Sequence, residues 1–171
     1  MKELIDSIKT ALDNKNWYVA LVSCLILPDI CGKIEFPTLQ STSQRYVKWF
    51  NKYLLHKYTR NVGSERTKHV FLSGEDCYAF RCSLVHEGTS DITTQRVQQA
   101  LTNFHFTIPN TRIHAHLNQF DSVLQLQVDC FCNEFIDGVN SWFNDIQTEM
   151  DKKAKLENLL KIVPPESIFS K

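Results

Sequence analysis

The spacing of apolar residues in the first part of the chain is typical of amphipathic helices. Residues 2–14 carry apolar side chains at intervals of three and four, and residues 43–57 repeat this spacing with large aromatic side chains. Between them, residues 17–31 are more apolar throughout. We expect this segment to bend or restart at Pro28, because proline lacks the backbone N–H that a helix interior needs. The pattern therefore predicts three helices, with a connection at residues 32–43.

A fourth helix is expected over residues 74–87, after a polar loop at residues 58–70. Ser73 precedes this helix and Asp76 follows three residues later, an arrangement that resembles a capping box. Gly88 comes directly after the last helical residue and favours a helix end there, because glycine adopts a left-handed backbone without steric cost.

Near residue 103 the period of the pattern changes from 3.6 residues to 2. Apolar and polar side chains then alternate in three short runs separated by turns, which predicts a three-stranded antiparallel meander at about residues 103–128. In the register that this predicts, His105 lies opposite His114, and His116 lies opposite Gln125. All the polar side chains then share one face of the sheet.

The final helical segment is predicted at residues 129–161, ended by a proline pair. The whole pattern predicts a mainly α fold, a helical bundle with the β-meander inserted before the long C-terminal helix. A chain of 171 residues is long enough to bury its own core, so we expect one domain over residues 1–171.

Charge and hydropathy narrow the classes of function. The formal net charge is zero, whereas proteins that grip long nucleic acids usually carry a basic excess. Any contact with nucleic acid must then be local. The N-terminus lacks the apolar core of a signal peptide, and the longest apolar run has eleven residues, against roughly 20 for a membrane span. We therefore expect a cytoplasmic protein with no membrane partner.

The six cysteines do not have the spacing of a metal site. They include no C-x-x-C pair, and the single C-x-C pair has no partner pair. Most of them lie within apolar runs, as free buried thiols do. We expect no metal and no cofactor.

Arg81 and His86 are the strongest candidates for chemistry. Histidine exchanges protons near neutral pH, and the planar charge of arginine matches a phosphate. Together they suit phosphodiester cleavage without a metal. Five residues of helix correspond to a rise of about 7.5 Å and a rotation of about 140°. The pair therefore meets if Arg81 reaches back, if the helix ends near His86, or if two copies combine their pairs across a dimer axis.

The stretch AFRCSLVHEG, which contains this pair, resembles the R-x(4–6)-H motif of the HEPN superfamily. The resemblance implies a small helical bundle, often a homodimer, and in many members a metal-independent ribonuclease of toxin–antitoxin, antiphage or CRISPR systems. It implies Arg81 and His86 as catalytic residues, with either Glu75 or Asp76 as the supporting acid. Cys82 stands where the family typically has a polar residue, often Asn.

Three functional hypotheses follow. The first is a homodimeric HEPN-type endoribonuclease that cleaves RNA, a toxin or antiphage effector with an antitoxin or other protein partner. The second is a non-catalytic HEPN-like dimeric interaction module. The third is a metal-dependent enzyme built on His105, His114 and His116, for which a solvated polar face is the simpler interpretation. The first hypothesis requires Arg81 and His86 to be accessible in a cleft, and the second expects them buried in satisfied contacts.

Overall fold

Helices dominate the fold, and two small β-sheets accompany them. The computed structural model describes residues 1–168. Its helices are α1 (Lys2–Asp13), α2 (Trp17–Leu25), α3 (Leu27–Glu35), α4 (Thr42–Tyr53), α5 (Gly74–Glu87), α6 (Val128–Asp145), α7 (Met150–Glu157) and α8 (Pro165–Ile168). Its strands are β1 (Thr59–Val62), β2 (Thr67–Val70), β3 (Asn103–Thr107), β4 (Asn118–Phe120) and β5 (Val123–Gln127). The predicted fold class, mainly helical with a small sheet before the C-terminal helices, is confirmed.

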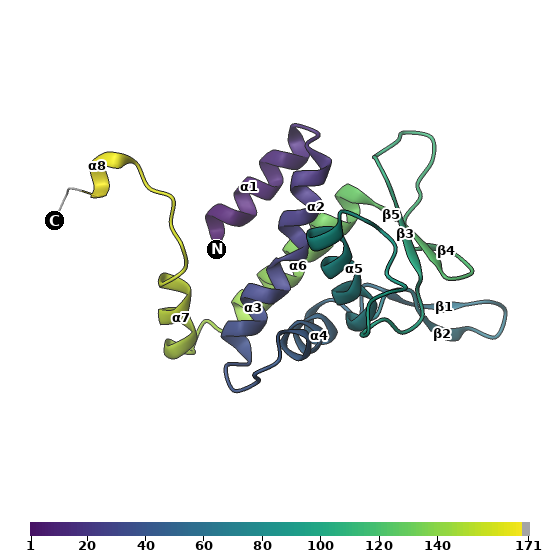
Figure 1. Ribbon diagram of the computed structural model, residues 1–171, viewed down its shortest axis with the longest axis horizontal. Helices are drawn as coiled ribbons and strands as arrows, with labels where there is room; N and C mark the ends of the chain where they lie inside the picture. The colour runs from purple at the N-terminus through teal and green to yellow at the C-terminus, as the bar shows by residue number, and fades with distance from the viewer. Residues whose placement is uncertain (169–171) are drawn as a thin grey trace.

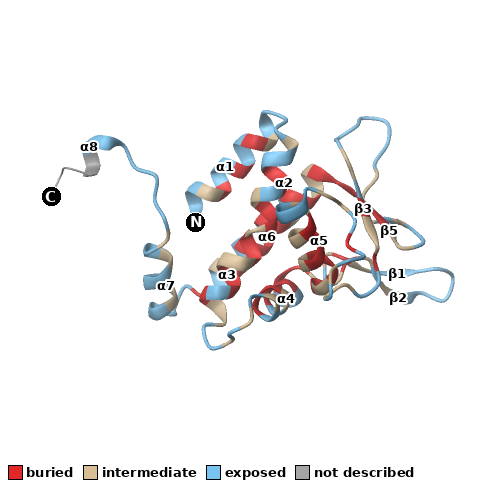
Figure 2. Ribbon diagram, viewed as in Figure 1, coloured by how far each residue is buried: buried red, intermediate tan, exposed pale blue. Residues whose placement is uncertain are grey.

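Helices α1 to α6 pack together, with both sheets at one end and α7 and α8 at the other (Figure 1). Buried residues line the inward faces of these helices (Figure 2). The bulkiest fully buried side chains include Trp49, Trp142, Tyr46, Tyr58, Phe50, Phe80, Phe131 and Phe135. Most of them come from α4, α5 and α6, so burial of aromatic surface holds these three helices together.

The apolar segment predicted as one bent helix forms the two helices α2 and α3. The break falls at Ile26, and Pro28 lies in the first turn of α3, where the missing N–H of proline costs no hydrogen bond. The predicted bend near Pro28 is therefore confirmed.

Helix α3 continues to Glu35, which corrects the expected connection at residues 32–43. Gly32 lies inside this helix rather than at its end. A Cβ atom at Gly32 would lie 2.8 Å from the carbonyl oxygen of Arg45. Glycine at this position lets α3 and α4 approach closely. Helix α4 begins after the cap residue Ser41 and ends at Tyr53, four residues before the predicted end.

The predicted polar loop at residues 58–70 contains the hairpin of β1 and β2. Thr59 pairs with Val70 and Val62 with Thr67 in an antiparallel register. Almost every residue of the two strands is exposed or half-buried. A strand that buries neither face shows no apolar alternation, which explains why the sequence pattern did not predict it.

Helix α5 has the predicted bounds. The Ser73 hydroxyl accepts a hydrogen bond from the Asp76 N–H at 3.0 Å. At the other end Gly88 adopts the left-handed backbone with φ of 70°, and its N–H donates to the Leu84 carbonyl at 3.1 Å. Both predicted caps are confirmed.

The sheet before α6 is mixed, not the predicted antiparallel meander. The strand order is β3-β5-β4, with β3 parallel to β5 and β4 antiparallel to β5. His105 therefore lies beside Gln125 rather than His114, and the pairings predicted for His114 and His116 are also wrong. The middle predicted strand is a loop at residues 108–117. Alternation reveals which face a side chain occupies but not which strand pairs with which.

The long helix predicted at residues 129–161 is divided into α6 and α7. The break follows Ile146, whose side chain is buried, and no glycine or proline marks it in the sequence. The turn brings Lys152 of α7 back to Glu35 of α3, at 2.7 Å between Nζ and Oε2. The Trp142 indole donates to the same carboxylate oxygen at 3.0 Å. Tertiary contacts thus set the end of α6.

The segment Trp17–Glu35, which comprises α2 and α3, is long and apolar enough to span a membrane. Half of its most apolar window is buried within the protein. A core helix of a soluble protein has the same length and composition as such a span. The cytoplasmic location expected from the sequence stays a prediction.

Candidate functional site

Arg81 and His86 lie on the same side of the C-terminal half of α5. The Arg81 guanidinium reaches along the helix, and its Nη1 atom lies 3.2 Å from Nε2 of His86. Of the three arrangements that would unite the pair, the structure has the first, in which Arg81 reaches back to His86 within one chain. His86 is exposed, whereas Arg81 is half-buried.

Asp29 of α3 anchors the other edge of the guanidinium. Arg81 Nε donates to Asp29 Oδ2 at 2.8 Å, across 52 residues of sequence. The contact ties α5 to the start of α3 and fixes the direction of the Arg81 side chain. The sequence analysis did not identify Asp29. Its signal was the position of an acid inside an apolar run, because a carboxylate in such a setting requires a partner.

The hydrogen bond between Arg81 and His86 can have only one direction. A guanidinium only donates hydrogen bonds, so Arg81 Nη1 is the donor and Nε2 of His86 is the acceptor. A neutral imidazole with an available lone pair is the form that removes a proton from a hydroxyl group. The pair is therefore arranged as a phosphate-binding cation beside a base.

The surroundings of Asp29 affect its charge. Burial raises the pKa of Asp29, and the nearby Arg81 and Arg45 guanidinium groups lower it by less. Its Oδ1 atom is buried and accepts no hydrogen bond from the residues described. Burial also raises the pKa of Tyr78 to about 12, so this phenol stays protonated near neutral pH. Of these neighbours, Tyr78 adds no charge beside the Arg81–Asp29 pair, whereas Arg45 adds a second positive charge near Asp29.

The two acidic candidates on α5 differ in their contacts. Asp76 is buried, and its Oδ1 accepts the Gln99 N–H at 2.7 Å, while Oδ2 accepts the Ala100 N–H at 3.2 Å. It also accepts the Ser73 hydroxyl at 3.1 Å. Asp76 therefore joins the start of α5 to the loop before β3. Within residues 1–168, Glu75 makes no hydrogen bond or ion pair. The acid in contact with Arg81 is Asp29 instead.

The ribonuclease hypothesis requires an accessible pair, and the interaction-module hypothesis expects a buried one. The solvent accessibility of Arg81 and His86 lies between these two cases. His86 is open to solvent, as an acid–base group must be, while Arg81 is half-buried and ion-paired. Cys82, the residue after Arg81, is half-buried with a free thiol. All six cysteines are free, as expected, and four of them are fully buried.

Only one of the three histidines predicted to share a sheet face lies on the sheet: His105 is on β3, whereas His114 and His116 lie in the loop before β4. His105 is exposed on β3. His116 has both ring nitrogens engaged, since Nδ1 accepts the Gln127 N–H at 3.2 Å and Nε2 lies 3.2 Å from Glu134 Oε1. Within residues 1–168, no group of three or more potential metal ligands has the geometry to hold an ion. The hypothesis of a metal-dependent enzyme finds no site in this region.

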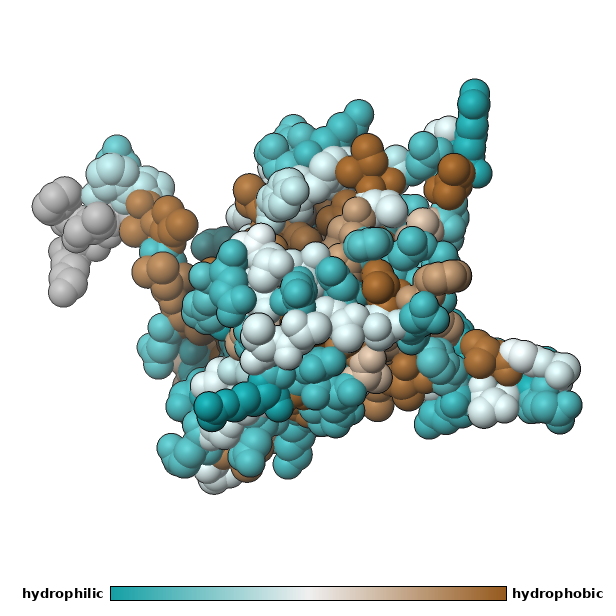
Figure 3. Space-filling view, turned by 45° about the vertical axis from the view of Figure 1, so that its right-hand side comes forward, coloured by the Kyte–Doolittle hydropathy of each residue, from teal (hydrophilic) through white to brown (hydrophobic). Residues whose placement is uncertain are grey.

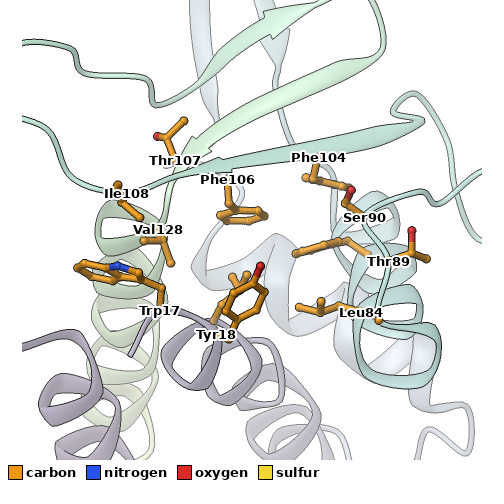
Figure 4. Close-up of a pocket in the computed structure, with 13 residues that line it drawn as sticks. Trp17, Tyr18, Leu84, Thr89, Ser90, Phe104, Phe106, Thr107, Ile108 and Val128 are labelled. Carbon is orange, nitrogen blue, oxygen red and sulfur yellow. The ribbon is translucent and has the colours of Figure 1, made fainter. Parts of the chain in front are cut away.

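A pocket of about 310 Å³ opens between α2, α5 and β3, and neither Arg81 nor His86 lines it. Trp17 and Tyr18 from α2 face Phe104 and Phe106 from β3 across it (Figure 4). Phe80 and Leu84 of α5 also line it. Phe80 lies almost parallel to Phe104 and Phe106, with ring centroids 4.5 and 5.3 Å apart. The sequence analysis treated these aromatic residues as core and did not predict the pocket.

Comparison with known proteins gives this site no external assignment. No protein-family model, no curated protein and no solved structure matches the chain. The resemblance to the HEPN superfamily therefore stays a prediction carried by the Arg81–His86 stretch, and the interpretation of the site depends on its own geometry.

Proposed function

We propose that the protein is a metal-independent endoribonuclease of HEPN type, with Arg81 and His86 as its catalytic residues. The observation that carries this proposal is the 3.2 Å contact between the Arg81 guanidinium and the exposed His86 imidazole. It brings together at the surface a fixed cation and a group that can act as a base. Phosphodiester cleavage at a ribose can use a cation to stabilise the phosphate and a base to activate the 2′-hydroxyl.

In the proposed reaction, a phosphate of the RNA takes the place of His86 on Nη1 of Arg81. The freed Nε2 of His86 accepts the proton of the adjacent ribose 2′-hydroxyl. The 2′-oxygen then forms a bond to phosphorus as the bond from phosphorus to the 5′-oxygen breaks, and the leaving oxygen takes up a proton from a general acid. The products are a 2′,3′-cyclic phosphate and a 5′-hydroxyl end. Arg81 stabilises the negative charge that grows on the phosphate oxygens.

Asp29 acts as a positioning residue in this proposal. Its bond to Arg81 Nε leaves the Nη atoms directed toward the surface, where a phosphate can approach. An arginine held in this way loses little side-chain entropy when it binds its ligand. Asp29 thus replaces Glu75 and Asp76 as the acid that supports the site.

The resemblance also supplies the proposed setting. We propose a homodimer that acts on RNA in the cytoplasm, as a toxin or antiphage effector restrained by an antitoxin or other protein partner. No metal or other cofactor takes part in the proposed reaction.

A non-catalytic dimeric interaction module is the second candidate, and a specific observation favours it. The ion pair with Asp29 already compensates the charge of Arg81. Near this pair, α2 and α5 leave Tyr18, Val22 and Val85 exposed. Contiguous exposed apolar side chains are a common feature of protein interfaces.

The test compares the wild type with Arg81→Ala and His86→Ala on total RNA in the presence of EDTA. We expect cleavage by the wild type and a loss of roughly 100-fold or more in each variant, the range for removal of a general base or a charge-stabilising group. Arg60→Ala and His105→Ala are matched controls, because both residues are exposed and neither contacts Arg81 or His86. Equal cleavage by all the proteins would contradict the assignment, and no cleavage by any would favour the interaction module.

A further inference from the structure

The aromatic pocket between α2, α5 and β3 has the chemistry of a site for a flat, uncharged ring. None of the 13 residues that line it carries a charge. Phe80 and Phe104 are buried and stack on one another, and Phe80 also stacks on the half-buried Phe106, so these rings form an apolar wall of the pocket behind the more exposed Trp17 and Tyr18. Tyr18, 80% exposed, stands at the mouth. A volume of about 310 Å³ is at the small end of the range for ligand pockets.

Polar groups at two edges of the pocket can supply hydrogen bonds. Thr89 and Ser90 lie at one edge, after the left-handed turn at Gly88, and Thr107 lies at the other, at the end of β3 (Figure 4). A few hydroxyls around aromatic walls suit a ligand with a π-face and a polar rim. A nucleobase has both features, whereas an aliphatic side chain has neither.

The pocket and the Arg81–Asp29 pair lie along one seam between α5 and the α2–α3 segment. Arg81, Leu84 and Gly88 follow one another at helical spacing on α5, and the last two line the pocket. On the opposite side of the seam, Tyr18 lines the pocket and Asp29 contacts Arg81. The seven residues from Arg81 to Gly88 correspond to about 10 Å along α5, the length of about three stacked nucleotides.

We infer that this pocket binds an unpaired base of the RNA, close to the phosphate that Arg81 holds. The inference rests on the proposed ribonuclease function and names the class of substrate, single-stranded RNA with an unstacked base near the cleaved bond. Proteins that bind single-stranded RNA use aromatic side chains in this way, because every base has a π-face. A neutral chain gains affinity from such stacking that it cannot gain from general phosphate attraction.

Trp17 makes the inference measurable. It lines the pocket and is half-buried, whereas Trp49 and Trp142, the other two tryptophans, are fully buried in the core. Quenching of tryptophan fluorescence therefore reports on the pocket. The full chain with His86→Ala, which cannot cleave in the proposed mechanism, is titrated with a hexamer of oligoadenylate. The matched probe is a hexamer of ribose phosphate without bases.

We expect the base-bearing hexamer to quench Trp17 and to bind about tenfold more tightly than the abasic hexamer. Tyr18→Ala removes most of this difference, while Tyr18→Phe keeps it, because the ring is what stacks. Phe120→Ala is the control, since Phe120 is an equally exposed aromatic residue on β4, outside the pocket. Arg81→Ala weakens the binding of both hexamers.

Each other outcome has a distinct meaning. Equal affinity for the two hexamers overturns the base pocket and leaves the ribonuclease proposal intact. Free adenosine binding as tightly as the hexamer assigns the pocket to a free base or nucleoside and overturns the RNA inference. Saturable binding of N-acetyltryptophanamide without any binding of RNA assigns it to a protein side chain and also overturns the inference. If Arg81→Ala and His86→Ala leave RNA cleavage unchanged while the base-bearing hexamer still quenches Trp17, only the ribonuclease proposal is contradicted.

Discussion

At the scale of single residues, Arg81 occupies the centre of the site because three constraints meet on its guanidinium. Asp29 holds Nε, His86 accepts from Nη1, and partial burial limits competing water. Each contact acts on a different edge of a rigid planar group, so the orientation of the guanidinium is well defined. Lysine, a flexible point charge, cannot satisfy both contacts at once.

Replacement of Asp29 tests whether Arg81 must be positioned. We expect Asp29→Asn to lower RNA cleavage by roughly 10- to 100-fold, because a small displacement of a catalytic group has such an effect. The free energy of unfolding should change by less than about 1 kcal/mol, because the buried carboxylate has a raised pKa and its charge already opposes folding. Cleavage assays and chemical denaturation measure the two quantities.

The pH dependence separates this role of Asp29 from a purely structural one. The pKa of Asp29 is raised in the folded state. As the pH falls, protonation of the Asp29 carboxylate therefore removes the free-energy cost of burying its charge and weakens its ion pair with Arg81. The wild type should therefore gain stability relative to Asp29→Asn as the pH falls through this pKa, while its activity declines. The variant should lack that acidic limb, and an unchanged activity profile would contradict the positioning role.

Asp76 and Glu75 provide a second comparison at this scale. Asp76→Ala removes the acceptor for Gln99 N–H and Ala100 N–H and leaves these groups unsatisfied near the start of α5. We expect a loss of about 2–4 kcal/mol in the free energy of unfolding. Glu75→Ala, one residue away, should change it by less than about 0.5 kcal/mol. A large effect of Glu75→Ala on cleavage, without an effect on stability, would instead restore Glu75 as the supporting acid.

At the scale of elements, Glu35 joins four helices at one buried carboxylate. Lys52 of α4 lies 3.0 Å from Oε1, and both Lys152 of α7 and Trp142 of α6 donate to Oε2. Although burial alone would raise the pKa of Glu35, the hydrogen bonds from Lys152, Lys52 and Trp142 lower it overall. This junction holds α7 against α3 after the break in the C-terminal helical segment.

Glu35→Gln tests the junction. We expect a loss of about 1–3 kcal/mol at neutral pH, because the partly buried Lys152 then has only the more exposed Glu149 as a charged partner. A lowered pKa stabilises the fold above the unfolded value of about 4.3, and this contribution is lost as the pH falls through the folded value. The difference between the wild type and the variant should therefore shrink below about pH 4. Asp145→Asn, which removes an exposed partner of Lys52, is the control and should cost less than about 1 kcal/mol.

Helices and strands were predictable from the sequence where residues within or next to the element, such as helix caps or alternating apolar side chains, determine its ends and faces. Both ends of α5 follow from Ser73 and Gly88, because a cap acts within a few residues. The faces of β3 and β5 followed from alternation, but their parallel pairing did not, since it depends on contacts across the intervening loop. The sequence placed Arg81 and His86 together. It did not supply Asp29, because a contact across 52 residues leaves no local pattern.

At the scale of the whole molecule, the proposed cleavage reaction requires two acid–base groups, and the Arg81–His86 pair of a single chain supplies one. Cleavage takes a proton from the 2′-hydroxyl and gives one to the leaving oxygen, and the pair on α5 contains a single histidine. A second copy would supply the second acid–base group. Apolar side chains are also exposed on the C-terminal arm (residues 158–166), where Leu160 and Ile162 are about 90% exposed. Figure 3 shows apolar surface on this arm.

We therefore expect the protein to sediment as a homodimer, with twice the chain mass of 19.9 kDa. If subunits exchange, a mixed dimer of wild-type and His86→Ala subunits contains one of the two histidines. An excess of His86→Ala should then lower cleavage by more than the dilution of wild-type chains if the site is shared. Cleavage that stays proportional to the wild-type chains, from a protein that sediments as a dimer, would show that each chain works alone. A monomer with full activity would contradict the shared site altogether.

The neutral charge of the chain leads to a prediction about salt. A protein that neutralises Z phosphates of a single strand shows a slope of about −0.7Z in log affinity against log salt concentration. The chain has 19 basic and 19 acidic residues, and in the proposed reaction Arg81 is the basic side chain that contacts a phosphate. With one or two phosphate contacts, affinity should fall only about 3- to 7-fold between 50 and 200 mM salt.

This dependence is measured with the non-cleaving His86→Ala variant and single-stranded RNA, by fluorescence titration at several salt concentrations. A shallow slope together with base-dependent quenching indicates that stacking in the aromatic pocket supplies most of the affinity. A slope steeper than about −3 would mean that RNA contacts many cations, which requires a basic surface formed by the dimer or a partner. In that case Tyr18→Ala should have little effect on affinity. The two measurements thus decide together whether this neutral protein holds RNA by its bases or by its backbone.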